Sequence, residues 1–96
     1  MAPIDIEFDP EKDRRNLAKH GVSLAKALDL SWEELVVLPD RRIDYGEERF
    51  IGYGKLGIRL YCVIFVLRHG TVRIVSLRKA NDREIKRYDQ SKDAIH

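Results

Sequence analysis

Two basic residues, Arg78 and Lys79, stand at the end of an apolar run and shortly before Asn81 and Glu84, whose spacing is typical of a helix start. The backbone N–H groups at a helix N-terminus favour an anion. A guanidinium can bind a phosphate through two parallel hydrogen bonds, and an ammonium group adds a point charge. The pattern therefore predicts a phosphate site, with ordinary solvated salt bridges as the alternative.

His20 follows Lys19 at the expected end of a helix, and an imidazole can titrate near neutral pH. Facing a phosphate, it could act as general acid or base. Spacing alone favours the alternative that an imidazolium complements the helix dipole beside Gly21. Asn16 lies one turn earlier on the same helix face, so it could orient the imidazole or fill a polar rim.

A second group of charges, Glu47, Glu48 and Arg49, lies at a turn that enters a strand. Glu47 could deprotonate the 2′-hydroxyl of a ribose, and Arg49 could stabilise the charged transition state. A cross-strand ion pair is the alternative for these residues. Tyr88 could stack on a base or donate to a phosphate, or it could belong to an amphipathic core.

Metal chemistry fits the sequence poorly, because the histidines His20, His69 and His96 show no ligand spacing and the acids form no evident cluster. Cys62 is the only cysteine and lies within an apolar run, which favours a packed thiol. We therefore expect metal-free acid–base and electrostatic chemistry on a polyanion, with no cofactor.

The elements that would position these residues start with a short strand, because Ile4, Ile6 and Phe8 alternate with acids. Asp9 and Pro10 then predict the start of a helix that runs to His20, with Gly21 as its left-handed cap. A second short helix is expected after Ser23. It should continue through Leu30.

Four strand-like runs separated by turns follow and predict an antiparallel meander. They are Leu35–Leu38, Arg49–Tyr53, Leu60–Leu67 and Val72–Leu77. A last helix should begin at Asn81 and fray near Ser91. The order predicts an α+β domain in which a small twisted antiparallel sheet packs against an N-terminal helical pair and a C-terminal helix.

Strict alternation along the last strand predicts which side chains share a face of the sheet. One face would carry Arg73, Val75, Leu77 and Lys79, and the other Val72, Ile74, Ser76 and Arg78. Arg73 and Arg78 are thus expected on opposite faces.

Composition limits the class of protein. The 96 residues, 44% of them hydrophobic and 35% charged, suit one globular domain over residues 1–96. Residues 1–58 carry nine Lys/Arg and twelve Asp/Glu, a net −3, whereas residues 59–96 carry nine against four, a net +5. A basic C-terminal half hints at a polyanion-facing surface. The longest apolar run is too short to span a membrane, and the N-terminus lacks a signal-peptide pattern. We therefore expect the chain to be located in the cytoplasm.

Four segments together resemble the BrnT family of toxins, whose fold is similar to that of RelE ribonucleases. They are Phe8–Lys12, Lys19–Ser23, Tyr45–Arg49 with Ile51 and Gly52, and Arg73–Ala80, with Asn16, Glu84 and Tyr88 in addition. The resemblance implies a growth-inhibiting ribonuclease that a BrnA-type antitoxin neutralises. It also implies a heterotetramer that binds DNA only through the antitoxin's ribbon-helix-helix part.

By analogy with RelE-like enzymes, the 2′-hydroxyl of RNA would attack the adjacent phosphate without a metal. With the motifs above, the candidate catalytic residues are His20, Glu47, Arg49, Arg78 and Tyr88, and the candidate phosphate-binding residues are Lys19, Arg73 and Lys79. The chain departs from the family's pattern after Ser23, where Leu24-Ala25-Lys26 lacks the usual aromatic residue and acids.

Two other functions stay open: a silent module that only completes a DNA-binding complex, and an RNA-binding domain without cleavage. The antitoxin could bind Trp32 or the apolar run Leu35–Leu38, whereas burial in the core is the alternative, favoured for Leu35 and Val37.

Overall fold

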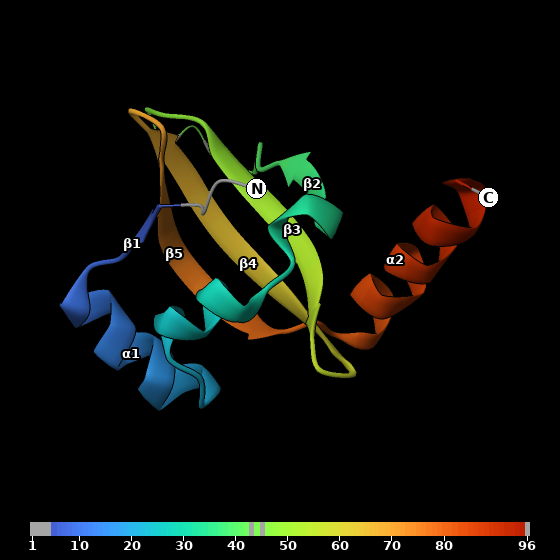
Figure 1. The fold of residues 1–96 in the computed structure, drawn as a ribbon, viewed down its shortest axis with the longest axis horizontal. Coiled ribbons are helices and arrows are strands. Elements are labelled where there is room, and N and C mark those ends of the chain that lie inside the picture. The colour runs from blue at the N-terminus through green and yellow to red at the C-terminus, as the bar shows by residue number, and fades with distance from the viewer. Residues whose placement is uncertain (1–4, 43, 45, 96) are drawn as a thin grey trace.

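The computed structural model describes the backbone of residues 5–42, 44 and 46–95 and their side chains up to Ser91. Ile4, Tyr45 and His96 lie outside the described residues. The described part is a mixed α+β structure built on one five-stranded sheet with the order β1-β5-β4-β3-β2 (Figure 1). The strands are β1 (Ile6–Glu7), β2 (Val36–Pro39), β3 (Arg49–Leu56), β4 (Arg59–Arg68) and β5 (Thr71–Lys79).

The pairing of neighbouring strands confirms the antiparallel meander from β2 to β5. The short strand β1 pairs with β5 in parallel, so the N-terminus returns to the edge of the sheet beside the last strand. None of the described helices is long and apolar enough to cross a membrane.

The first helix, α1 (Pro10–His20), has the caps that the sequence predicts. The Asp9 carboxylate accepts a hydrogen bond from the Lys12 N–H at 3.2 Å, and Pro10 occupies the first turn. Gly21 takes the left-handed conformation, with φ of 73°, and its N–H donates to the Leu17 carbonyl. These caps fix His20 as the last helical residue.

The second helical segment is a 3₁₀ helix, η1 (Leu24–Asp29), and a further 3₁₀ turn, η2 (Trp32–Glu34), follows it. Ser23 caps η1 by accepting from the Ala25 N–H. The acidic partner missing after Ser23 is replaced by Asp13 of α1, which accepts from the Ser23 hydroxyl at 2.9 Å and the Leu24 N–H at 2.7 Å. A carboxylate from the preceding helix therefore holds this turn.

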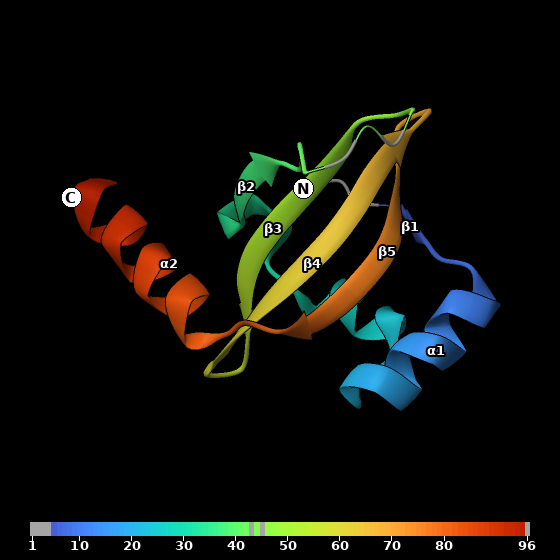
Figure 2. The ribbon, with the colours of Figure 1, turned by 180° about the vertical axis from the view of Figure 1, so that it is seen from behind.

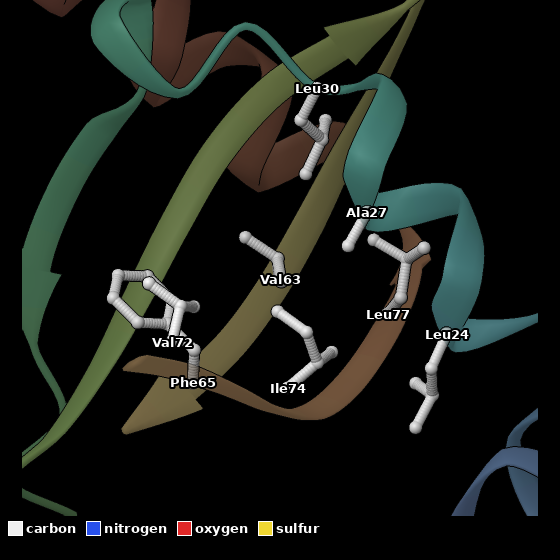
Figure 3. Packing of buried hydrophobic residues seen from close by; sticks show 8 residues of the cluster. All are labelled: Leu24, Ala27, Leu30, Val63, Phe65, Val72, Ile74 and Leu77. Carbon is white, nitrogen blue, oxygen red and sulfur yellow. The ribbon is translucent and has the colours of Figure 1, made fainter. Parts of the chain in front are cut away.

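The hydrophobic core lies between η1 and one face of the sheet, as Figure 3 shows. Side chains from η1 and the residue after it point at side chains of β4 and β5, and the cluster consists of Leu24, Ala27, Leu30, Val63, Phe65, Val72, Ile74 and Leu77. Full burial of such side chains contributes about 1.5 to 3 kcal/mol each. Trp32 packs edge-on against Phe65, with ring centroids 5.3 Å apart, and donates its indole N–H to the Ala27 carbonyl.

A β-bulge in β5 overturns the predicted faces of this strand. Ser76 pairs with Ile64 and Ile74 pairs with Phe65, so Val75 is an extra residue without a partner on β4. Counting across the bulge, Arg73 and Arg78 lie on the same face, because their partners Val66 and Cys62 share a face of β4. Strict alternation failed here because one residue interrupts the period of two.

The last helix, α2 (Asp82–Ile95), starts with the predicted capping box. The Asn81 N–H donates to Glu84 and the Glu84 N–H donates to the Asn81 side chain, both at 2.9 Å. The helix continues past Ser91 and projects away from the sheet (Figures 1 and 2). One side of the helix, from Glu84 to Ser91, lines a small groove with β2 and Tyr53. The helix does not cover the sheet as the sequence interpretation expected.

The sheet face opposite the core is not covered by a helix, as Figure 2 shows from behind. We call it the open face. It is formed by Arg49, Ile51, Tyr53, Lys55, Leu60, Cys62, Ile64, Val66, Arg68, Thr71, Arg73, Ser76 and Arg78.

Candidate active site

Four arginines share the open face. Arg68 lies near the end of β4 opposite Thr71, and the other three lie at two levels along the strands. Arg49 of β3 and Arg73 of β5 both lie opposite Val66 of β4, so they flank one buried valine. Arg78 lies opposite Cys62, four residues back along β4, which is roughly 13 Å away along the strand. The open face therefore carries positive charge at both ends.

Arg78 is held by Glu84, whose carboxylate also accepts from Tyr53. Its Nη1 and Nη2 atoms donate to the two oxygens of the Glu84 carboxylate at 2.8 and 2.9 Å. The Tyr53 hydroxyl donates to the same carboxylate at 3.0 Å. Arg78 thus forms the ion pair foreseen as the alternative to a phosphate site, although the Glu84 side chain is only 14% exposed. The pair fixes the plane of the guanidinium at the junction of β5 and α2.

The protonation states of this cluster follow from its contacts. The Arg78 guanidinium, aided by the Asn81 N–H and the Tyr53 hydroxyl, lowers the pKa of Glu84 to about 2 against the opposing effect of burial. Hydrogen bonding to Glu84 raises the pKa of Arg78, and burial raises the pKa of Tyr53. At neutral pH the cluster is therefore a carboxylate, a guanidinium and a protonated phenol.

Cys62 lies under this cluster and is 1% exposed. Burial raises the pKa of its thiol to about 11. The thiol is therefore protonated at neutral pH and packed, in agreement with the sequence interpretation.

His20 lies in a shallow pocket of about 240 Å³ between α1 and the bulge of β5. The lining residues are Lys12, Arg15, Asn16, Lys19, His20, Val75 and Ser76. Partial burial lowers the pKa of His20 from its usual 6.5, and the positive charges of Lys19 and Arg78 lower it further. The neutral imidazole, which can accept a proton, is therefore the main form at neutral pH.

Asn16 does not orient this imidazole. Its side chain is buried, and it donates to the carbonyls of Leu77 at 2.8 Å and Val22 at 2.9 Å. Its oxygen accepts from the Leu77 N–H at 3.3 Å. The carboxamide therefore takes the place of a neighbouring strand at the edge of β5 and fixes α1 there.

Glu47 is far from the Arg78 cluster. It pairs with Arg68, which donates to both carboxylate oxygens at 3.0 Å, so the cross-strand ion pair named as the alternative is what forms. Arg49 lines a different pocket of about 300 Å³, together with Asp40, Asp44 and Glu47. The structure therefore separates the predicted Glu47 and Arg49 from the predicted His20 and Arg78.

The remaining candidates lie around the edges of the open face. Arg73 donates to Glu7 of β1 at 3.3 Å. Lys79 pairs with Tyr61 and so faces away from Arg78. Lys19 is exposed beside His20. Tyr88 lies one turn beyond Glu84 and lines a small groove with Tyr53 and apolar side chains of β2.

Sequence reasoning missed Tyr53 and the role of Glu84 toward Arg78. Alternation along β3 puts Tyr53 on the face of Arg49, which is a signal that could have identified it. Glu84 was recognised only as a cap. Within the described ranges, no three His, Cys, Asp or Glu side chains gather as a group able to hold a metal ion.

A protein-family model described as the ribonuclease toxin, BrnT, of type II toxin-antitoxin systems matches residues 8–84. The matched range contains α1, the strands β2 to β5 and Glu84, and so every candidate residue except Tyr88. No curated protein matches the chain.

Proposed function

This chain belongs to the BrnT family of ribonuclease toxins of type II toxin-antitoxin systems, and we propose that it cleaves RNA without a metal at the Arg78 end of the open face. The observation that carries the proposal is the guanidinium of Arg78, fixed by the Glu84 carboxylate that also accepts from Tyr53, together with the lowering of the His20 pKa, to which the charge of Arg78 contributes. A fixed cation beside a neutral base suits phosphodiester cleavage.

In the proposed reaction, neutral His20 takes the proton of the ribose 2′-hydroxyl. The 2′ oxygen forms a bond to the adjacent phosphorus, the bond from phosphorus to the 5′ oxygen breaks, and the departing oxygen takes a proton from water. The products are a 2′,3′-cyclic phosphate and a 5′-hydroxyl. Arg78 stabilises the additional negative charge on the phosphate oxygens, and Tyr88 stacks on a neighbouring base.

The other candidates bind rather than react in this proposal. Lys19 attracts a phosphate next to the scissile one, and Arg73 and Arg49 bind the RNA farther along the open face. Lys79 faces away from Arg78 and attracts RNA only from outside the cleavage site. Glu47 has no part in the reaction, because Arg68 already pairs with its carboxylate. We also propose that the sheet and helices form a RelE-like arrangement, and that the chain acts in the cytoplasm.

A toxin of this class acts together with an antitoxin. We propose a BrnA-type antitoxin that forms a heterotetramer with the chain and alone contacts DNA. The edge strand β2 is the proposed contact, because Val37 and Leu38 are each 43% exposed there. Trp32 and Leu35 pack against the core instead. Val37→Asp should reduce co-purification with the antitoxin, and unchanged co-purification would contradict this contact.

The test is incubation of the purified chain with 5′-labelled RNA in EDTA, beside Arg78→Ala and Arg78→Lys. The proposal expects cleavage in EDTA that yields cyclic-phosphate ends, is lost in Arg78→Ala and is only partly retained in Arg78→Lys, since lysine lacks the planar fork. Growth arrest should disappear with Arg78→Ala while antitoxin binding persists.

Three results would contradict the proposal. Full activity of Arg78→Ala would refute the site, and cleavage abolished by EDTA would refute the metal-free route. Intact RNA with salt-sensitive binding, together with harmless expression of the wild-type chain, would favour an RNA-binding or silent module instead.

A further inference from the structure

The exposed face of α1 carries a row of three cations that the proposed reaction does not use fully. Lys12, Arg15 and Lys19 follow the helical spacing of three and four residues, so they form one stripe roughly 10 Å long. We infer that this stripe is a binding track for the backbone of single-stranded RNA, leading to His20 and Arg78. This inference rests on the proposed function.

The anchoring of α1 determines which way the stripe faces. Asn16 lies in the middle of the same stripe, and its carboxamide is bonded to Leu77 at the edge of β5. The cations on either side of Asn16 must therefore flank the junction of α1 and β5. They line the pocket whose opposite wall is formed by Val75 and Ser76 at the bulge.

The charges in this pocket are uncompensated. The ion pairs of the described residues do not involve Lys12, Arg15 or Lys19, and no described Asp or Glu lines the pocket. On the same helix, Arg14 is paired with Glu11. Exposed cations without carboxylate partners, beside a pocket without acids, suit a ligand with regularly repeated negative charge.

The track is continuous with the proposed reaction centre. Lys19 precedes His20, and the positive charges of both Lys19 and Arg78 lower the pKa of this imidazole, so the three groups share one region of positive potential. An RNA chain whose phosphates follow the stripe would thus reach His20 with its next phosphate near Arg78. This geometry favours RNA, the substrate of the reaction, over an acidic protein.

The experiment measures the binding of a fluorescent 2′-O-methyl RNA oligonucleotide, which has no free 2′-hydroxyl to attack, by anisotropy over a range of salt concentrations. The test variant is the double substitution Lys12→Ala with Arg15→Ala. The matched control, Arg14→Ala with Lys26→Ala, also removes two positive charges but from paired residues on other surfaces. All four positions are exposed helical sites where alanine is well tolerated.

Each phosphate contact with single-stranded nucleic acid contributes a slope of about −0.7 in a plot of log affinity against log salt. Loss of two contacts should therefore reduce the slope by about 1.4 and weaken binding about 25-fold near 0.1 M salt. The control should keep the wild-type slope. Equal slopes for the wild-type chain and the test variant would overturn the track, as would equal losses in test and control.

Cleavage of a dinucleotide by the wild-type chain tests the proposed function by itself, because so short a substrate occupies only the His20 pocket and cannot follow the whole stripe. The track predicts that the test variant loses more activity on a longer RNA than on the dinucleotide. If the wild-type chain cleaves the dinucleotide and both variants bind RNA like the wild type, the track fails and the proposed function stands. If the wild-type chain neither binds nor cleaves RNA, both fail.

Discussion

Replacing Glu84 with Gln removes the charge that pairs with Arg78 but keeps the cap of α2, because the glutamine oxygen can still accept from the Asn81 N–H. Its amide nitrogen then stands in the place of the second carboxylate oxygen and can donate to the Tyr53 oxygen. The pKa of Glu84 is lowered to about 2 from its usual 4.5, which corresponds to at most about 3 kcal/mol of stabilisation of the folded state. The Arg78 side chain is 30% exposed, and screening by water reduces this to about 1 to 2 kcal/mol.

The pH dependence of this loss identifies its cause. A carboxylate with a lowered pKa in the folded state stabilises the protein above the pKa of the unfolded chain, and this stabilisation disappears as the pH falls toward the folded-state pKa. Urea unfolding should thus show Glu84→Gln less stable than the wild type near pH 7. More than half of that difference should be gone near pH 3.

Two results would refute the reasoning. A difference that is as large near pH 3 as near pH 7 would mean that the substitution acts through packing and not through charge. Equal stability of the two proteins near pH 7 would mean that the Arg78–Glu84 pair contributes nothing to folding. Glu84→Ala provides the comparison, because it also removes the cap of α2 and should lose more stability at every pH.

Three further predictions concern the supports of the site. Asn16→Leu should cost about 2 to 3 kcal/mol in urea unfolding, since it leaves the backbone groups of Leu77 unpaired; a loss near zero would contradict the anchoring of α1. An NMR titration should place the pKa of His20 below 6.5, and Arg78→Ala should raise it by removing a positive neighbour; a midpoint at or above 6.5 in the wild-type chain would be contrary evidence. Cys62 should react with a thiol reagent near pH 8 only after unfolding, because its thiol is buried and its pKa is about 11; rapid labelling of the folded chain would disprove this.

Local signals allowed much of the fold to be predicted. The caps at Asp9 and Gly21, and the reciprocal bonds of Asn81 and Glu84, depend on residues close in the sequence, so their types reveal the helix ends. The strands of the meander are likewise separated by recognisable turns. That η1 is a 3₁₀ helix was harder to predict from the sequence, because Asp13 of the preceding helix supports it from outside the segment.

The candidate site was only partly predictable, because its geometry depends on pairing between distant segments. The bulge in β5 exists only relative to β4, so the sequence pattern placed Arg73 and Arg78 on opposite faces. Glu47 has the right chemistry for a base, yet the hairpin of β3 and β4 brings it to Arg68. Asn16 was assigned to the imidazole because helical spacing does not reveal the edge of β5.

The bulge also changes what an alteration in chain length would do to this protein. Removal of one residue from the middle of a strand normally turns half of its side chains to the wrong side. Here, loss of Val75 would leave Ile74 next to Ser76, and simple alternation would then keep Ile74 and Leu77 in the core and Arg73 and Arg78 outside. The sheet could thus be shortened by one residue without rearrangement, and what would disappear is the wall of the His20 pocket. We therefore expect a chain without Val75 to fold and to differ from the wild type at the His20 pocket.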